Sequence, residues 1–237
     1  GNNVLAHVPD INDFVGGLQI VLADEGVLSM EFPHLLRVIE QTQFDTIYHE
    51  HFSYLSLLTV QRIFAHHGLQ VFDVEELPTH GGSLRVFAQR NGASHAVTDA
   101  VERVLGDEHT AKLGSLAGYT DFSVRVEKVR SDLLAFLDQA KVKEKQVVGY
   151  GAPAKGNTLL NYCQAGPELI QYTVDRSPHK QGKLLPGTHI PVRSPEDIAK
   201  TKPDYVLILP WNLRDEIVEQ MQHIREWGGQ FVLPIPE

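Results

Sequence analysis

The chain has 237 residues, 42% of them hydrophobic, with a formal net charge of −9 and a single cysteine. This composition excludes a disulfide framework and a cysteine zinc site, and the negative charge without a Lys/Arg block argues against nucleic-acid binding. No apolar run reaches the length of a membrane span, and the first residues lack a signal-peptide pattern. We therefore expect a soluble cytoplasmic protein with one large or two modest domains.

The first part of the chain predicts a mixture of helices and strands from the spacing of its apolar residues. Pro9 and Asp10 mark a helix start, Thr59 is a possible N-cap and Gly68 a stop. The last two strands are separated by a loop too long for a tight turn, so they form a looped antiparallel pair. Helices are expected at 11–22, 35–40 and 58–67, and strands at 27–32, 69–75 and 83–89.

The second part contains two helices and then alternates strands with helices. This alternation predicts a parallel sheet with helices on both faces. One short helix is expected to be capped by Ser194. Helices are expected at 96–105, 115–142, 155–164, 194–200 and 213–227, and strands at 146–150, 170–175, 205–209 and 230–234.

Residues 48–51, Tyr-His-Glu-His, place four groups able to exchange a proton in consecutive positions within an apolar setting. Burying several ionisable side chains costs free energy unless each has a partner. A hydrated polar loop explains the pattern, and so does a proton-transfer site. A metal site fits less well, because neighbouring side chains diverge and helical metal motifs space two His four residues apart.

A second pattern, Gly-Tyr-Gly-Ala-Pro-Ala-Lys-Gly at 149–156, joins a predicted strand to a predicted helix. Such a loop can bring backbone N–H groups to a phosphate, but Pro153 and Ala154 depart from the dinucleotide fingerprint. Tight packing of strand against helix explains the glycines equally well. Polar residues after the next two strands should gather at the same sheet edge, where ligands bind. These are Asp175, Arg176, Ser177, His179, Lys180, Trp211, Asn212 and Arg214.

Seven stretches, which together extend over essentially the whole chain, resemble one enzyme family. They are NNVLAHVPD (2–10), EFPHLLRVIE (31–40), FDTIYHEHFSYLS (44–56), LPTHGGSLRVF (77–87), GYGAPAKGNTLLN (149–161), VDRSPHKQGKLLPGTHIPV (174–192) and LPWN (209–212). The chain resembles the C-terminal part of the S-adenosylmethionine-dependent C-methyltransferases that act on nucleotide-linked keto-deoxysugars.

The resemblance implies an α/β fold with three parts. Residues 1–92 would be the C-terminal half of a class I methyltransferase domain with an antiparallel last strand, 93–145 a helical connector, and 146–237 a Rossmann-like domain. In this family zinc belongs to an N-terminal domain, so no metal is expected here. The loop that holds most of S-adenosylmethionine is also expected upstream. We therefore expect a truncated polypeptide that alone binds this cofactor weakly or not at all and is inactive.

C-methylation beside a ketone requires a base that removes the α-proton and donors that stabilise the enolate oxygen. The resemblance gives His51 as the base, with Glu50 as its neighbour and rival for that role. Tyr48 and His7 match active-site positions of the family. His49 has the weakest claim, since packing or a backbone hydrogen bond would explain it.

Ligand contacts follow from the same resemblance. The partner would be a nucleotide-diphosphate keto-deoxysugar, with C3 as the methylated carbon, and neither nucleic acid nor membrane is expected. Asn2, Asn3 and Leu5 would touch one side of S-adenosylmethionine. The candidates for substrate contacts are Lys155, Asn157, Lys180 and Asn212, with His80 as a further residue lining the cleft.

Two alternatives remain open from the sequence. One is a non-catalytic module that binds a nucleotide-sugar through the C-terminal domain. The other is an NAD(P)-dependent oxidoreductase, suggested by the glycine loop at 149–156 and the parallel sheet. Asp175 ends the second strand of that sheet, where an acid that binds a ribose would lie.

Overall fold

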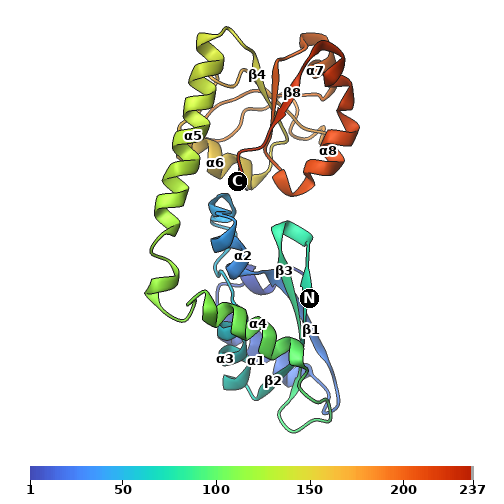
Figure 1. Cartoon of the computed structure of the whole chain (residues 1–237). Coiled ribbons are helices and arrows are strands. Elements are labelled where there is room, and N and C mark those ends of the chain that lie inside the picture. Colours follow the sequence, from blue (N-terminus) through green and yellow to red (C-terminus); the bar gives the residue numbers. More distant parts are fainter. Residues whose placement is uncertain (236–237) are drawn as a thin grey trace. The chain divides into compact units, whose positions relative to one another are not determined.

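The computed structural model describes residues 1–235, which form two compact units (Figure 1). Unit 1 holds Gly1–Glu40 and His49–Phe122, and unit 2 holds Gln41–Tyr48 and the chain from Ser123 onward. A short piece from the first half of the chain is therefore part of the second unit. The three-part division at 92 and 145 stays a prediction, and residues 236–237 of its last part lie outside the described chain.

Unit 1 is built on a three-stranded sheet of order β1-β3-β2, with β1 at Leu28–Pro33, β2 at Leu69–Leu77 and β3 at Ser83–Arg90. The central strand β3 is antiparallel to both neighbours, as expected for the last strand of a class I methyltransferase sheet. Glu31 N donates to Gly1 O over 2.9 Å, and Asn3 N donates to Glu31 O over 2.8 Å. The start of the chain thus lies beside the outer edge of β1.

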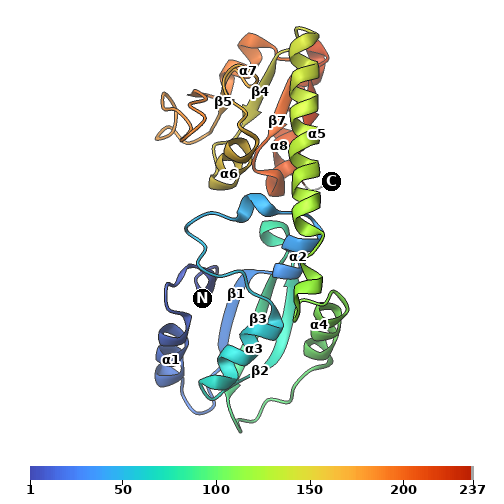
Figure 2. The ribbon, with the colours of Figure 1, turned by 90° about the vertical axis from the view of Figure 1, so that its left-hand side faces the viewer.

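Unit 1 also contains the α-helices α1 (Ile11–Val21), α2 (Leu35–Glu40), α3 (Leu57–His66) and α4 (Asp99–Thr110) (Figure 2). The Asp10 side chain caps α1 by accepting from two backbone N–H groups of its first turn. The expectation that Thr59 caps α3 is wrong. Ser56 is the cap, and its hydroxyl accepts from Thr59 N, which already lies in the first turn.

A buried carboxylate ties α4 to α3. Glu108 is 1% exposed, and its two oxygens accept from Leu57 N at 2.6 Å and Leu58 N at 2.8 Å. His34, which is also 1% exposed, has its Nε2 2.8 Å from Glu108 Oε1. A negative charge at the N-terminus of α3 is favourable because the first N–H groups of a helix lack intrahelical acceptors.

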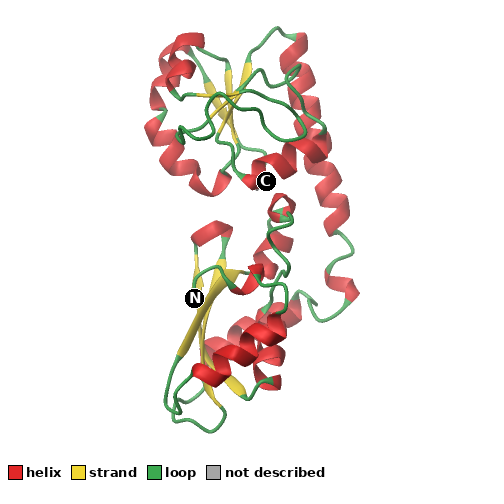
Figure 3. Cartoon of the chain, turned by 180° about the vertical axis from the view of Figure 1, so that it is seen from behind, coloured by secondary structure: helices red, strands yellow, loops and turns green. Residues whose placement is uncertain are grey.

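Unit 2 is built on a five-stranded sheet of order β6-β5-β4-β7-β8, in which each neighbouring pair is parallel. Figure 3 shows helices flanking this sheet on both sides, as the alternating pattern predicts. Its strands are β4 (Val147–Tyr150), β5 (Thr173–Val174), β6 (Val192–Arg193), β7 (Tyr205–Ile208) and β8 (Gln230–Val232), and its helices are α5 (Phe122–Val142), α6 (Ala154–Cys163), α7 (Glu196–Thr201) and α8 (Arg214–Gln220).

Several predicted bounds in the second half are wrong. The helix expected at 115–142 begins at Phe122, and the helix expected at 213–227 is α8 flanked by 3₁₀ turns at Trp211–Leu213 and Gln222–Trp227. Ser194 makes no side-chain cap, because Pro195 occupies the N-cap position of α7. The edge strand β6 was not expected, since two residues are too few to show a period. Within residues 1–235, no helix is long and apolar enough to cross a membrane.

The piece of unit 2 that comes from the first half of the chain is here named the inserted segment (residues 41–48). Its 3₁₀ turn Phe44–Thr46 packs against α6, and the ring of Phe44 meets that of Tyr162 edge to face at 5.1 Å. Residues 42–46 are all buried. The inserted segment is therefore part of the unit 2 interior.

Candidate functional site

The histidine site of unit 1 begins with His7, which a 3₁₀ turn at Leu5–His7 presents beside residues 50–53. Ala6 O accepts from Phe52 N at 2.9 Å and from Ser53 N at 3.2 Å. His7 Nδ1 lies 2.8 Å from Glu50 O. Because a carbonyl oxygen only accepts, Nδ1 carries the hydrogen, and in the neutral ring Nε2 keeps the lone pair.

His51 lies next to His7. Their ring centroids are 4.7 Å apart, and the His51 ring meets the ring of Tyr54 edge to face at 5.9 Å. His51 is half-buried, whereas the side chains of His49 and Glu50 are exposed. Tyr48 is half-buried and is the last residue of the inserted segment, so it belongs to unit 2. Three residues of this loop, His49, Glu50 and His51, belong to unit 1, and among these three His51 is the least exposed.

A second cluster in unit 1 involves two residues predicted for different ligands. Asn3 Nδ2 lies 3.3 Å from Nε2 of His80, at the turn between β2 and β3. Asn3 Oδ1 is buried without a hydrogen-bond partner among the described residues. Asn2 is exposed and pairs with Glu31, whereas Leu5 is 0% exposed in the core, so its side chain offers no surface to a ligand.

The loops after β4, β5 and β7 meet in unit 2, as expected, around a pocket of about 260 Å³. Asp175 lines this pocket, and one of its oxygens accepts from Ala152 N and the other from Ser177 N, each at 2.8 Å. Lys180 Nζ donates to Ala152 O at 2.9 Å and approaches Asp175 Oδ2 at 3.3 Å. A bound dinucleotide would use a backbone N–H group of this loop and the acid after β5. In this structure these two groups, Ala152 N and the Asp175 carboxylate, bind each other.

Packing accounts for the glycines of this loop. A Cβ on Gly149 would lie 2.7 Å from Oγ1 of Thr173 in β5, and one on Gly156 would lie 2.9 Å from Cβ of Leu209. Gly151 has φ +91°, and a Cβ there would lie 2.6 Å from Pro210 Cδ. These close approaches favour strand–helix packing over a phosphate loop and weigh against the oxidoreductase interpretation.

Two other predicted substrate residues, Lys155 and Asn212, form a separate cluster. Lys155 Nζ donates to Asn212 Oδ1 at 2.8 Å and lies 4.2 Å from the centre of a Trp211 ring. Burial lowers the pKa of Lys155, while the charge of Asp45 raises it. The fourth substrate candidate, Asn157 in α6, has a buried Oδ1 without a partner in the described chain.

Asp45 completes this cluster and was not among the predicted site residues. It is 0% exposed, and Oδ2 accepts from Nε1 of Trp211 at 2.7 Å. Burial raises its pKa to about 6, against the opposing effects of the Trp211 bond and the charge of Lys155. In the sequence, only the apolar residues Phe44 and Ile47 close to it could have drawn attention to it.

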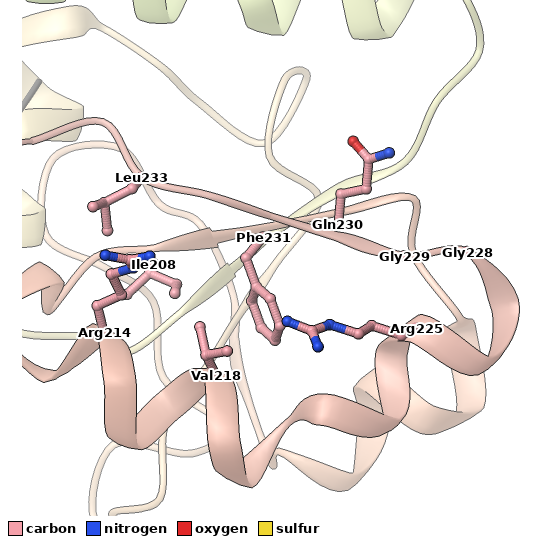
Figure 4. Close-up of a pocket in the computed structure, with 9 residues that line it drawn as sticks. All are labelled: Ile208, Arg214, Val218, Arg225, Gly228, Gly229, Gln230, Phe231 and Leu233. Atoms are coloured by element: carbon pink, nitrogen blue, oxygen red, sulfur yellow. The ribbon is translucent and has the colours of Figure 1, made fainter.

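A larger groove of about 700 Å³ runs along β8 and is lined in part by Arg214, one of the residues expected at the ligand-binding edge of the sheet. Figure 4 shows Phe231 and Val218 between the side chains of Arg214 and Arg225. Over the described residues, no group of three or more His, Cys, Asp or Glu is placed to hold a metal ion.

Comparison with known proteins agrees with the resemblance seen in the sequence. A family model described as the C-methyltransferase C-terminal domain matches residues 78–236. C-methyltransferase NovU of Streptomyces niveus is 41% identical over 237 residues, which is 100% of this chain and 56% of that protein. The chain thus spans about half the length of the curated relative that it matches.

Proposed function

The chain belongs to the family of C-methyltransferase C-terminal domains, and from this premise we propose that its histidine site provides the base for methyl transfer to carbon. The supporting observation is the pair of imidazoles, with His7 held by the Glu50 carbonyl at 2.8 Å and His51 at 4.7 Å between ring centroids. A half-buried imidazole is a suitable acceptor for a proton from carbon. Its enclosure favours His51 over the exposed Glu50 carboxylate.

The proposed reaction requires three changes at the substrate. His51 accepts the proton from the carbon beside the ketone, and the electron pair moves onto the carbonyl oxygen as an enolate. His7 Nε2, when protonated, and the Tyr48 hydroxyl are the candidate donors to this oxygen. The carbon would then form its new bond to the methyl group as the ketone is restored, while the bond from that methyl group to the donor sulfur breaks and leaves its electron pair on the sulfur.

S-adenosylmethionine supplies the electrophilic methyl group in this proposal. Asn3 fits one polar contact to it, because its buried Oδ1 lacks a partner in the described chain. Asn2 offers an exposed neighbour, and Leu5 could contribute through its backbone. These residues would hold only part of so large a molecule.

The proposed substrate is a nucleotide-diphosphate keto-deoxysugar that is methylated at C3. Lys180, in the pocket at the carboxyl edge of the unit 2 sheet, is the candidate for the nucleotide part. Lys155 and Asn212 are also candidates for substrate contacts. Their positions have a second explanation within the protein, since they bind each other beside Trp211. His80 is the candidate for the sugar in unit 1, where its Nε2 lies 3.3 Å from Asn3 Nδ2.

The test follows the α-proton directly. With substrate in D₂O, the wild type should exchange the α-proton for deuterium, and His51→Gln should lose about a hundredfold of this exchange and of methyl transfer. His49→Gln is the matched control, since His49 is an exposed neighbour. Unchanged α-proton exchange in His51→Gln would exclude His51 as the base, and the same assay on Glu50→Gln would then test its rival.

A non-catalytic binding module is the second candidate function, favoured by the pocket of about 260 Å³ at the sheet edge of unit 2. It predicts nucleotide-sugar binding in calorimetry without exchange of the α-proton. The chain alone, which spans about half the length of its relative, is expected to bind S-adenosylmethionine weakly. Tight stoichiometric binding by this chain would contradict that expectation.

A further inference from the structure

One buried hydrogen bond joins the inserted segment to the rest of unit 2. The indole Nε1 of Trp211 donates to Asp45 Oδ2 at 2.7 Å across 166 positions of sequence. Asp45 is 0% exposed and Trp211 is 5% exposed, so water does not compete for either group. A bond of this kind is directional, and it forms only when the inserted segment lies in one place on unit 2.

One further side chain, Lys155, contacts the indole ring. The Lys155 ammonium lies 4.2 Å from the centre of a Trp211 ring, close enough for a cation–π interaction. The same ammonium is fixed by its 2.8 Å bond to Asn212 Oδ1. Lys155 also contributes the positive charge that opposes the burial of Asp45. The four side chains of Asp45, Trp211, Lys155 and Asn212 therefore form one connected cluster.

Burial of the Asp45 carboxylate costs free energy, so the stability of the fold alone does not explain it. Burial raises its pKa to about 6, and Oδ1 has no hydrogen-bond partner among residues 1–235. An apolar side chain of similar size would fill the same space without removing a charge from water. The benefit of Asp45 is the defined geometry of its bond with Trp211.

That geometry bears on Tyr48, which follows Asp45 by three residues. Thr46 Oγ1 donates to Gln43 O at 2.7 Å, and Ile47 N donates to Phe44 O at 2.9 Å, so the backbone between them is ordered by its own hydrogen bonds. The inserted segment ends at Tyr48, the first residue of the Tyr-His-Glu-His loop. Where Asp45 is fixed, the backbone that carries Tyr48 is also fixed on unit 2.

We infer that Asp45 and Trp211 are positioning residues, which hold the inserted segment, and with it the backbone of Tyr48, in one place on unit 2. The anchoring is a property of unit 2 itself. Its kinetic consequence rests on the proposed function, in which Tyr48 is a donor to the enolate oxygen. Neither residue needs to touch the substrate.

Hydrogen–deuterium exchange in the full-length protein tests the anchoring. Trp211→Phe removes the donor and Asp45→Ala the acceptor, and each should speed amide exchange of residues 41–48 about tenfold. Asp45→Asn keeps a carbonyl acceptor for the indole and should stay within about threefold of the wild type. Trp227→Phe is the matched control, since its indole donates to Pro203 O at 3.0 Å elsewhere in unit 2. Equal exchange in Trp211→Phe and Trp227→Phe would overturn the inference.

Kinetics of the same variants test the link to catalysis. Trp211→Phe and Asp45→Ala should lower kcat at least about tenfold, with KM for the nucleotide-sugar within about twofold, and Asp45→Asn should restore most of kcat. Faster amide exchange with unchanged kcat would overturn the positioning role. Absence of methyl transfer in the wild type would instead contradict the proposed function, while the exchange result would still decide the anchoring.

Discussion

His7 and Glu50 are joined by a hydrogen bond of 2.8 Å between the imidazole Nδ1 and the backbone carbonyl, across 43 positions of sequence. This bond orients the His7 ring and also holds the backbone immediately before His51. His7 therefore has a structural reason for its position in addition to any chemical one.

The first prediction separates these two roles of His7. Asparagine can place an N–H near the position of the imidazole Nδ1, so His7→Asn should keep the bond to Glu50 O, whereas His7→Ala loses it. Because neither variant has Nε2, we expect both His7→Ala and His7→Asn to lower the rate of methyl transfer about tenfold or more. Recovery of most of the loss in His7→Asn would show that His7 acts through its bond to Glu50 O alone.

The second prediction concerns Gly151, where backbone conformation and crowding act together. Gly151→Ala places a Cβ 2.6 Å from Pro210 Cδ at φ +91°, and should cost about 2–4 kcal/mol of unfolding free energy. Gly182 has φ +77° with no atom within 4 Å of a built Cβ, so Gly182→Ala should cost only about 1 kcal/mol. Urea denaturation compares them, and similar losses would mean that crowding at Pro210 contributes nothing.

The third prediction tests the buried carboxylate of unit 1. Glu108→Ala leaves His34 Nε2 and the N–H groups of Leu57 and Leu58 without their acceptor, and should cost about 3–5 kcal/mol. Glu102 is an exposed residue of the same helix, so Glu102→Ala should change stability by about 0.5 kcal/mol or less. Thermal unfolding of both variants provides the comparison, and a small effect of Glu108→Ala would refute the capping role.

The fourth prediction is a dependence of stability on pH that arises from Asp45. Its pKa is raised from 3.8 to about 6, so the folded state holds the proton more tightly than the unfolded state. The resulting stabilisation is complete below pH 3.8 and is lost as the pH rises through about 6, amounting to about 3 kcal/mol at most. The positive charge of Lys155, which faces Asp45, opposes this rise in pKa but does not reverse it.

Asp45→Asn removes this titration while it keeps a side chain of the same shape. Between pH 4 and 7 the urea midpoint of the wild type should therefore fall relative to that of Asp45→Asn. If the difference between the two proteins stays constant with pH, the buried carboxylate does not titrate in this range.

Local patterns in the sequence were sufficient for most helices and strands. The alternation of apolar residues predicts β2 and β3 as an antiparallel pair, and the repeated strands and helices of the second half predict a parallel sheet. The two-residue strand β6 shows no such pattern, because its place depends on pairing with β5. The helix at 213–227 is interrupted although its apolar spacing is helical throughout.

Local sequence patterns were less informative about the candidate site than about the helices and strands. Resemblance to a family indicates His7 and His51, and the structure brings their rings together. In the sequence, Asp45 and Glu108 look like ordinary polar residues. Their burial depends on partners far away in the sequence, Trp211 for Asp45 and His34 for Glu108. No spacing rule within one segment contains that information.

The path of the chain through the inserted segment has a consequence for recombining proteins of this family. The matched family region begins at residue 78, yet unit 2 also includes residues 41–48. A chimera joined between two relatives at residue 78 would therefore combine a foreign Asp45 segment with the native α6 and Trp211. Such hybrids should fold best when residues 41–48 come from the same parent as the chain after residue 123.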